Sequence, residues 1–173
     1  GQAQLVDQSF AENEKEVQKR KPRVSTYPLY LLFTSGRTGE PKGVTISHGN
    51  VASYLDFVCD RYGYNSNDRI SQTFELSFDL SVHDMLCAWT SGAALVPFSS
   101  TALLSPARLM KKSGLTCWFS VPSQATLMAK ARNLKVGNFP DLRISLFCGE
   151  AMAVRVAQEW SDAAPGSTIE NLY

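Results

Sequence analysis

Short apolar runs alternate with longer amphipathic segments along most of the chain, and this alternation restricts the fold more than any other feature. Short β-branched, aromatic or aliphatic runs predict strands, and longer segments with apolar positions three and four residues apart predict helices. A strand followed by a helix and another strand is a βαβ unit, which builds a parallel sheet. The sequence therefore predicts an α/β fold of successive βαβ units, with a largely parallel sheet covered by helices. The predicted strands are 29–33, 69–74, 93–98, 116–121, 143–148 and 168–173, and the predicted helices are 47–62, 80–91, 105–113, 122–133 and 153–163.

A glycine-rich loop directly follows the first predicted strand. Residues 29–33 are all apolar or aromatic, as expected of a strand buried on both faces of a parallel sheet. The composition then changes to hydroxyls, glycines and cations, so that exposed backbone amides and hydroxyl donors can surround an anion. Lys42 adds a mobile charge behind Pro41, which stiffens the loop.

Such clusters are often plain turns, but the combination of strand, hydroxyls, lysine and proline favours a phosphate-binding loop. Neither the Walker A pattern nor the G-x-G-x-x-G dinucleotide fingerprint fits these residues. The candidate phosphate-binding residues are Thr34, Ser35, Gly36, Arg37, Thr38, Gly39 and Lys42, of which Thr34 and Lys42 are the catalytic candidates.

Residues 30–44, Tyr-Leu-Leu-Phe-Thr-Ser-Gly-Arg-Thr-Gly-Glu-Pro-Lys-Gly-Val, resemble the signature loop of the adenylate-forming enzymes. This superfamily includes acyl-CoA synthetases, luciferases and the adenylation domains of peptide synthetases. The resemblance implies that the loop holds the β- and γ-phosphates of ATP together with Mg²⁺. Arg37 departs from the pattern, because the family usually has Ser or Thr there, and it adds positive charge beside the phosphate site.

Asp79 opens the helix predicted over 80–91, within the run Phe-Asp-Leu-Ser-Val-His-Asp at 78–84. An aspartate at this position can simply cap the helix through its free amides. In amino-acid-activating members of the family, however, the Phe-Asp-x-Ser motif supplies the aspartate that pairs with the substrate ammonium group. The resemblance therefore favours amino-acid activation, with a helix-capping role as the alternative.

Carried over motif by motif, the resemblance also implies a substrate pocket and an adenine site. For Leu146 and Cys148, plain core packing is the alternative. His83 is the pocket candidate that titrates near physiological pH, and filling of space on a helix face is its alternative. The implied substrate-binding residues are Asp79, Leu80, His83, Ser123, Leu146, Cys148 and Leu172. The implied adenine-binding residues are Gly149, Glu150, Ala151, Asn171, Leu172 and Tyr173, with close backbone approach at Gly149 and ring stacking at Tyr173.

Composition excludes several classes of protein. The 173 residues are 44% hydrophobic and 19% charged with a net charge of +1, which is typical of a globular protein and argues against a nucleic-acid partner. No apolar run approaches a membrane span, and no signal-peptide pattern is present, so the cytoplasm is expected. The four cysteines are far apart and lack a C-x-x-C pair, which predicts buried free thiols and no metal site within the sequence.

Both ends suggest an excerpt from a longer protein. The first residue is not Met, and the chain stops directly after a predicted strand. Residues 1–26 are polar and predict a linker or preceding segment, whereas 27–173 predict a partial AMP-binding adenylation domain without its small C-terminal domain.

The predicted function is ATP-dependent activation of a carboxylate as an acyl-adenylate, with release of pyrophosphate. An amino acid is the expected substrate, and a phosphopantetheinyl carrier protein or CoA is the expected thiol acceptor, as in peptide-synthetase adenylation domains and D-alanine carrier-protein ligases. The alternatives are an acyl-CoA ligase for a non-amino carboxylic acid and a non-catalytic nucleotide-binding fragment. The fragment alone is predicted to be inactive.

Overall fold

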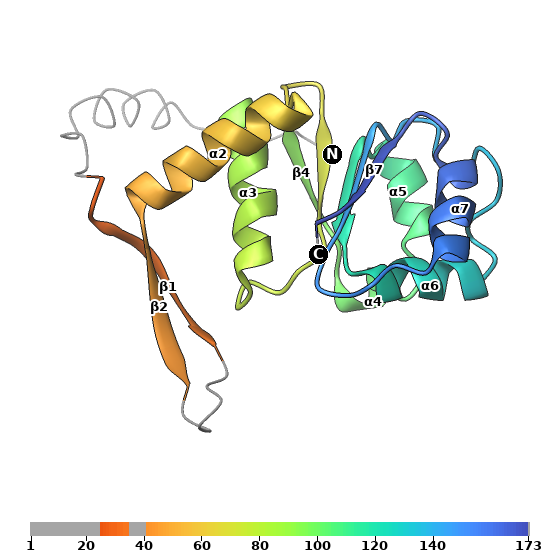
Figure 1. Cartoon of the computed structure of the whole chain (residues 1–173). Coiled ribbons are helices and arrows are strands. Elements are labelled where there is room, and N and C mark those ends of the chain that lie inside the picture. Colours follow the sequence, from red (N-terminus) through yellow and green to blue (C-terminus); the bar gives the residue numbers. More distant parts are fainter. Residues whose placement is uncertain (1–24, 35–40, 173) are drawn as a thin grey trace, which may run out of the picture.

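The computed structural model describes residues 25–34 and 41–172, which form a parallel sheet with helices on both faces and a hairpin beside it (Figure 1). The sheet has five strands in the order β4-β3-β5-β6-β7, and every neighbouring pair is parallel. The predicted α/β architecture is therefore confirmed. Its strands are β3 (Arg69–Gln72), β4 (Ala94–Pro97), β5 (Cys117–Ser120), β6 (Ile144–Phe147) and β7 (Thr168–Asn171).

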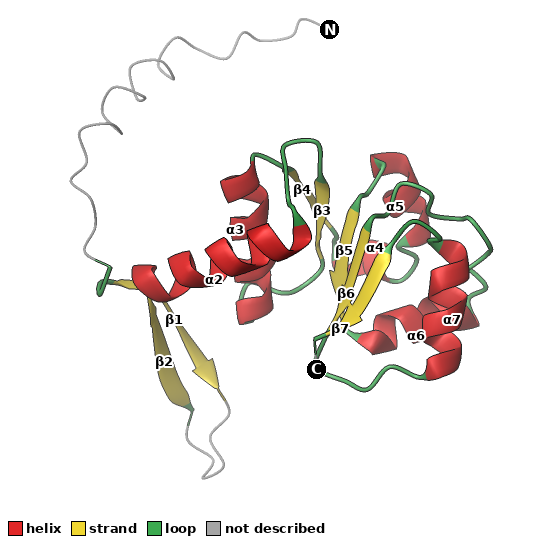
Figure 2. Ribbon diagram, turned by 45° about the horizontal axis from the view of Figure 1, so that its top comes forward, coloured by secondary structure: helices red, strands yellow, loops and turns green. Residues whose placement is uncertain are grey.

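The two faces of the sheet bury two separate cores. Side chains alternate along each strand, so Trp118 and Phe147 enter one core while Phe119 and Leu146 enter the other. Figure 2 shows α2 and α3 on one side of the sheet and the remaining helices on the other. These helices are α2 (His48–Tyr62), α3 (Asp79–Ser91), α4 (Ser100–Leu103), α5 (Ala107–Ser113), α6 (Pro122–Lys130) and α7 (Val154–Ala163).

The first predicted strand does not belong to the parallel sheet, so that prediction was wrong. β1 (Pro28–Thr34) instead pairs antiparallel with β2 (Lys42–Ser47), a strand that the sequence analysis missed. Two strands joined by a short loop can only pair as a hairpin, because a parallel pair needs a long crossover. Leu31 and Phe33 are 51% and 65% exposed instead of buried on both faces.

Helix ends follow local sequence signals in most places. Ser47 forms a capping box with Asn50 at the start of α2, and α2, α3 and α5 all end at glycines in the left-handed conformation. The helix predicted over 105–113 starts later than expected: α5 begins after Pro106 without a side-chain cap, and the short α4 precedes it. Among the described residues, no helix has both the length and the apolar composition needed to cross a bilayer.

Candidate functional site

Two of the phosphate-loop candidates, Thr34 and Lys42, lie at the end of the β1–β2 hairpin where β1 ends and β2 begins. Thr34 and Lys42 are cross-strand partners in the register of the hairpin, so the residues at which β1 ends and β2 begins lie side by side. Ser35, Gly36, Arg37, Thr38 and Gly39 lie outside the described residues. The structure therefore places the two catalytic candidates opposite each other at the hairpin tip.

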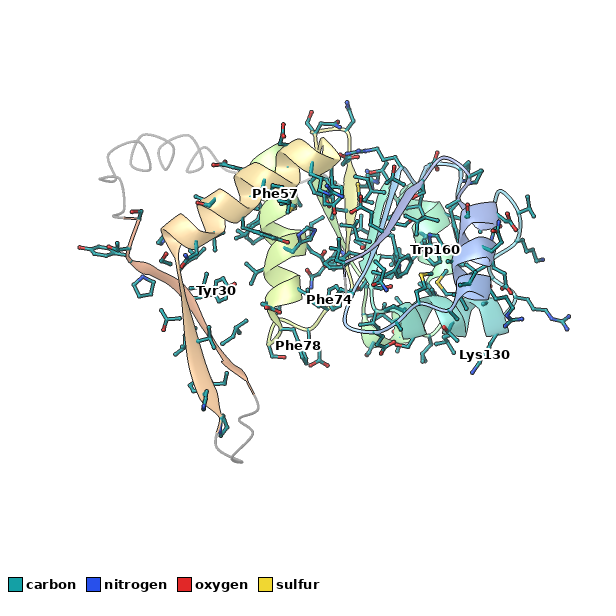
Figure 3. The ribbon with its side chains drawn as sticks, viewed as in Figure 1. Tyr30, Phe57, Phe74, Phe78, Lys130 and Trp160 are labelled. Atoms are coloured by element: carbon teal, nitrogen blue, oxygen red, sulfur yellow. The ribbon has the colours of Figure 1, made fainter. Side chains whose placement is uncertain are left out.

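A cavity of about 310 Å³ lies between the hairpin, α2 and α3. Its polar groups come from all three elements, and a second hollow beside it shares Tyr30, Ile46 and Asp79. Figure 3 shows Tyr30 on the hairpin and Phe78 at the start of α3, on either side of this region. The residues that line the cavity are Tyr30, Ile46, Asn50, Val51, Tyr54, Leu55, Asp79, Leu80, Val82, His83 and Leu86.

Asp79 does not cap its helix. The N-cap of α3 is Phe78, no side-chain cap bond is formed there, and Asp79 is the first helical residue. Its carboxylate is exposed and faces Tyr30, whose phenol pKa is raised by burial and by the Asp79 charge. The structure therefore contradicts a side-chain cap bond at Asp79, which is instead an acidic residue in the first turn of α3.

His83 lies one turn after Asp79 and is 4% exposed. Its Nδ1 atom is 2.7 Å from the Tyr54 hydroxyl, and its Nε2 atom is 3.4 Å from the Tyr64 hydroxyl. Burial lowers the pKa of His83 to about 4 from its usual 6.5, so the ring is neutral at physiological pH. The structure thus makes His83 a neutral wall of the cavity.

The other implied pocket residues divide into two groups. Leu146 and Cys148 are buried in the core that also includes Phe119, and Leu80 packs against this core. Burial raises the pKa of the Cys148 thiol to about 11, and the nearby charges of Asp84, Asp79 and Glu150 add to the effect. Ser123 and Leu172 are exposed instead, beyond the ends of β5 and β7.

The adenine candidates gather at the carboxyl edge of the sheet. Ser120, Phe147 and Asn171 are in register, so β5, β6 and β7 end level with one another. The Glu150 carboxylate accepts hydrogen bonds from the Ser123 amide and hydroxyl at 2.9 and 3.1 Å, and the Asn171 side chain donates to the Glu150 carbonyl at 3.1 Å.

Gly149 lies in the turn after β6 and has a φ of +81°. A residue with a side chain adopts this backbone conformation only under strain. Glu150, Ala151 and Leu172 are exposed in this turn, and Tyr173 lies outside the described residues. This edge is where open α/β sheets bind ligands.

No cluster of three or more His, Cys, Asp or Glu side chains suited to a metal occurs among residues 25–34 and 41–172. All four cysteines are free, with Cys87, Cys117 and Cys148 buried and Cys59 half-buried. Sequence reasoning missed the contribution of Tyr30, Asn50 and Tyr54 to the cavity, although Tyr54 lies three residues after the buried Val51 and therefore on the same side of α2.

Comparison with known proteins identifies the family. The family model of the AMP-binding enzymes matches residues 2–173. The chain belongs to the AMP-binding enzyme family. It is 35% identical to an L-proline–L-prolyl-carrier protein ligase of Pseudomonas fluorescens, over 83% of this chain and 30% of that protein. It is 36% identical to a D-alanine–D-alanyl carrier protein ligase of Listeria monocytogenes, over 83% of this chain and 29% of the relative.

Solved structures of other proteins agree with the fold. IdnL7 matches with a TM-score of 0.80 and 43% identity, over 87% of this chain and 30% of that one. The Vibrio cholerae adenylation domain AlmE, solved with glycyl-adenosine-5′-phosphate, matches with a TM-score of 0.86 and 34% identity, over 92% of this chain and 30% of AlmE. The chain therefore spans about 30% of the length of these relatives.

Proposed function

We propose that the full-length protein activates an amino acid as its adenylate at the expense of ATP. The substrate carboxylate attacks the α-phosphorus of ATP, an oxygen–phosphorus bond forms, and pyrophosphate leaves. The observation that carries this proposal is Asp79, an exposed carboxylate at a cavity mouth that is not used as a helix cap. An ammonium group is the natural partner for such a carboxylate.

Each part of the proposed site has a role in positioning or in charge stabilisation. Thr34 and Lys42, at the two feet of the hairpin loop, would direct the phosphates of ATP. Gly149 and Asn171, at the carboxyl edge of the sheet, would receive the adenine ring. The neutral His83 and the apolar cavity wall would then face the substrate side chain.

The partners follow the same reasoning. ATP is the nucleotide of adenylate-forming enzymes, and a neighbouring structure, FmoA3, is solved with AMPPNP bound. We expect Mg²⁺ to accompany the phosphates of ATP. We also expect a carrier-protein thiol as the acceptor, because the names of the relatives include carrier-protein ligases, and the cytoplasm as the location.

The test is ATP–pyrophosphate exchange by the full-length protein across a panel of amino acids and matched carboxylic acids without the amino group. Exchange with amino acids is the expected result. Exchange only with the deamino acids would instead support an acyl-CoA ligase, and no exchange with any acid would contradict adenylation.

A further inference from the structure

The His83 ring is held on two sides by phenols from outside its own helix. Tyr54 reaches it from α2 and Tyr64 from the loop after α2, at 2.7 and 3.4 Å. Phe119 on β5 packs edge-on against the imidazole with ring centroids 4.9 Å apart. The ring is therefore fixed by three elements as well as by α3.

The two ring nitrogens cannot play the same role. A neutral imidazole has one N–H donor and one acceptor nitrogen. The 2.7 Å contact suits an O–H donor, so we expect the Tyr54 hydroxyl to donate to Nδ1 and the ring proton to lie on Nε2, toward Tyr64. The Cys87 sulfur is 3.7 Å from Nδ1 and 4.0 Å from Nε2, within the range of a weak contact.

We propose that Tyr54 is a positioning residue for substrate selection, which holds His83 as a hydrogen-bonded wall of the cavity beside Asp79. Both ring nitrogens face protein partners, so the wall offers no free nitrogen and no charge to a substrate side chain. The site then favours an amino acid with an uncharged side chain, chosen by shape. This inference rests on the proposed function, because it assigns the cavity to the amino acid.

Tyr54→Phe in the full-length protein is the central variant, and Tyr62→Phe is its matched control. Both residues are on α2, but the Tyr62 hydroxyl donates to Glu170 at 2.8 Å and makes no contact with His83. Loss of one neutral hydrogen bond changes an equilibrium about fivefold. We expect Tyr54→Phe to change the ratio of kcat/KM between a small and a larger uncharged amino acid about fivefold, mainly through KM, and Tyr62→Phe to leave the ratio unchanged.

A double-mutant cycle separates positioning from a general loss of structure. If Tyr54 acts through His83, the effect of Tyr54→Phe on the ratio disappears in the His83→Phe background, because the hydrogen bond is already absent. Additive effects of the two changes, or equal effects of Tyr54→Phe and Tyr62→Phe, would overturn the proposal.

Nitrogen NMR of histidine-labelled protein tests the hydrogen bond independently of activity. The sequence has two histidines, so a His48→Gln variant assigns the His83 signals. We expect the Nε2–H tautomer in the wild type and a shifted tautomer balance in Tyr54→Phe. An Nδ1–H tautomer, or an unchanged spectrum in Tyr54→Phe, would contradict the inference. If no amino acid supports ATP–pyrophosphate exchange, the proposed function is wrong. The NMR experiment would still show whether the Tyr54–His83 hydrogen bond is present.

Discussion

The β1–β2 hairpin and the parallel sheet are both built from apolar strands, yet they differ in what covers them. All residues of β5 and β6 are buried between two layers of helices. In the hairpin, Leu31, Phe33 and Val44 are exposed, and α2 is the main element in contact with it. The sheet therefore buries far more apolar surface than the hairpin, and the hairpin flanks the loop proposed to bind phosphate.

The largest expected effect is on the sheet side. Trp160 is fully buried, donates its indole N–H to the Ser145 hydroxyl at 2.8 Å and packs against Phe147. Trp160→Ala should lower the free energy of unfolding by about 3 to 5 kcal/mol through cavity formation. Trp160→Phe, which keeps most of the volume, should cost clearly less in denaturant titrations. Equal losses would mean that packing is not what stabilises this face.

A pH effect is expected at His83, where the cavity meets the sheet. Its pKa is lowered to about 4 in the folded protein by burial, whereas the unfolded chain takes up the proton near 6.5. The unfolded state thus binds more protons between these values, so stability is complete above pH 6.5 and is lost as the pH falls toward 4. The loss should reach about 3 kcal/mol.

His83→Gln should lack this contribution, because glutamine does not titrate. The measurement is the free energy of unfolding of wild type and variant between pH 4 and 7. Parallel curves would show that His83 does not stay neutral in the fold.

Substitution of Asp79 tests whether the cavity beside the hairpin binds an amino acid. Because Asp79 is exposed, its contact with an ammonium group should be worth a charged hydrogen bond, about 1.5 to 3 kcal/mol. Asp79→Ala should therefore reduce exchange about tenfold to hundredfold for an amino acid and far less for its deamino analogue. An equal loss of exchange for both substrates would show that Asp79 does not bind the substrate ammonium group.

Lys42→Ala should separate function from stability in the hairpin. Removal of a phosphate-directed cation should slow adenylation about tenfold to hundredfold. Because Lys42 is exposed, the free energy of unfolding should change by less than about 0.5 kcal/mol. Pyrophosphate exchange and denaturant titration of the same preparation measure both, and an unchanged exchange rate would exclude the phosphate role.

The smallest expected effect is at the junction between the hairpin and α2. Ser47 ends β2 and caps α2, and its hydroxyl accepts a hydrogen bond from the Asn50 amide at 3.2 Å. Ser47→Ala should cost about 1 kcal/mol of stability, and Ser47→Asp should restore most of it. If Ser47→Ala has no effect on thermal unfolding, the capping box does not tie the two elements together.

Local sequence patterns determined much of this protein. The alternation of strands and helices predicted the parallel sheet. Ser47 caps the start of α2, and Gly63, Gly92 and Gly114 end α2, α3 and α5 in the left-handed conformation. The motif at 30–44 predicted the family. Each of these features depends on residues that are close together in the sequence, so the sequence alone is enough to predict them.

The α3 helix marks the limit of such reading. The apolar stripe of α3 predicts its buried face, but the residues that are buried include Ser81, Asp84 and Cys87. The stripe consists of Val82, Met85, Leu86 and Trp89. Val82 and Leu86 line the cavity instead, and Trp89 is 62% exposed. In α3, apolar periodicity therefore did not identify the face that the rest of the chain buries.

Three features depend on tertiary structure alone: the strand with which residues 29–33 pair, the exposure of Asp79, and the contacts of two tyrosine hydroxyls with His83. Tyr54 and His83 are 29 residues apart in the sequence, and their contact exists because α2 and α3 pack on the same face of the sheet. The chain's order therefore determined the elements and the family, whereas the cavity depends on contacts between elements, which no local pattern encodes.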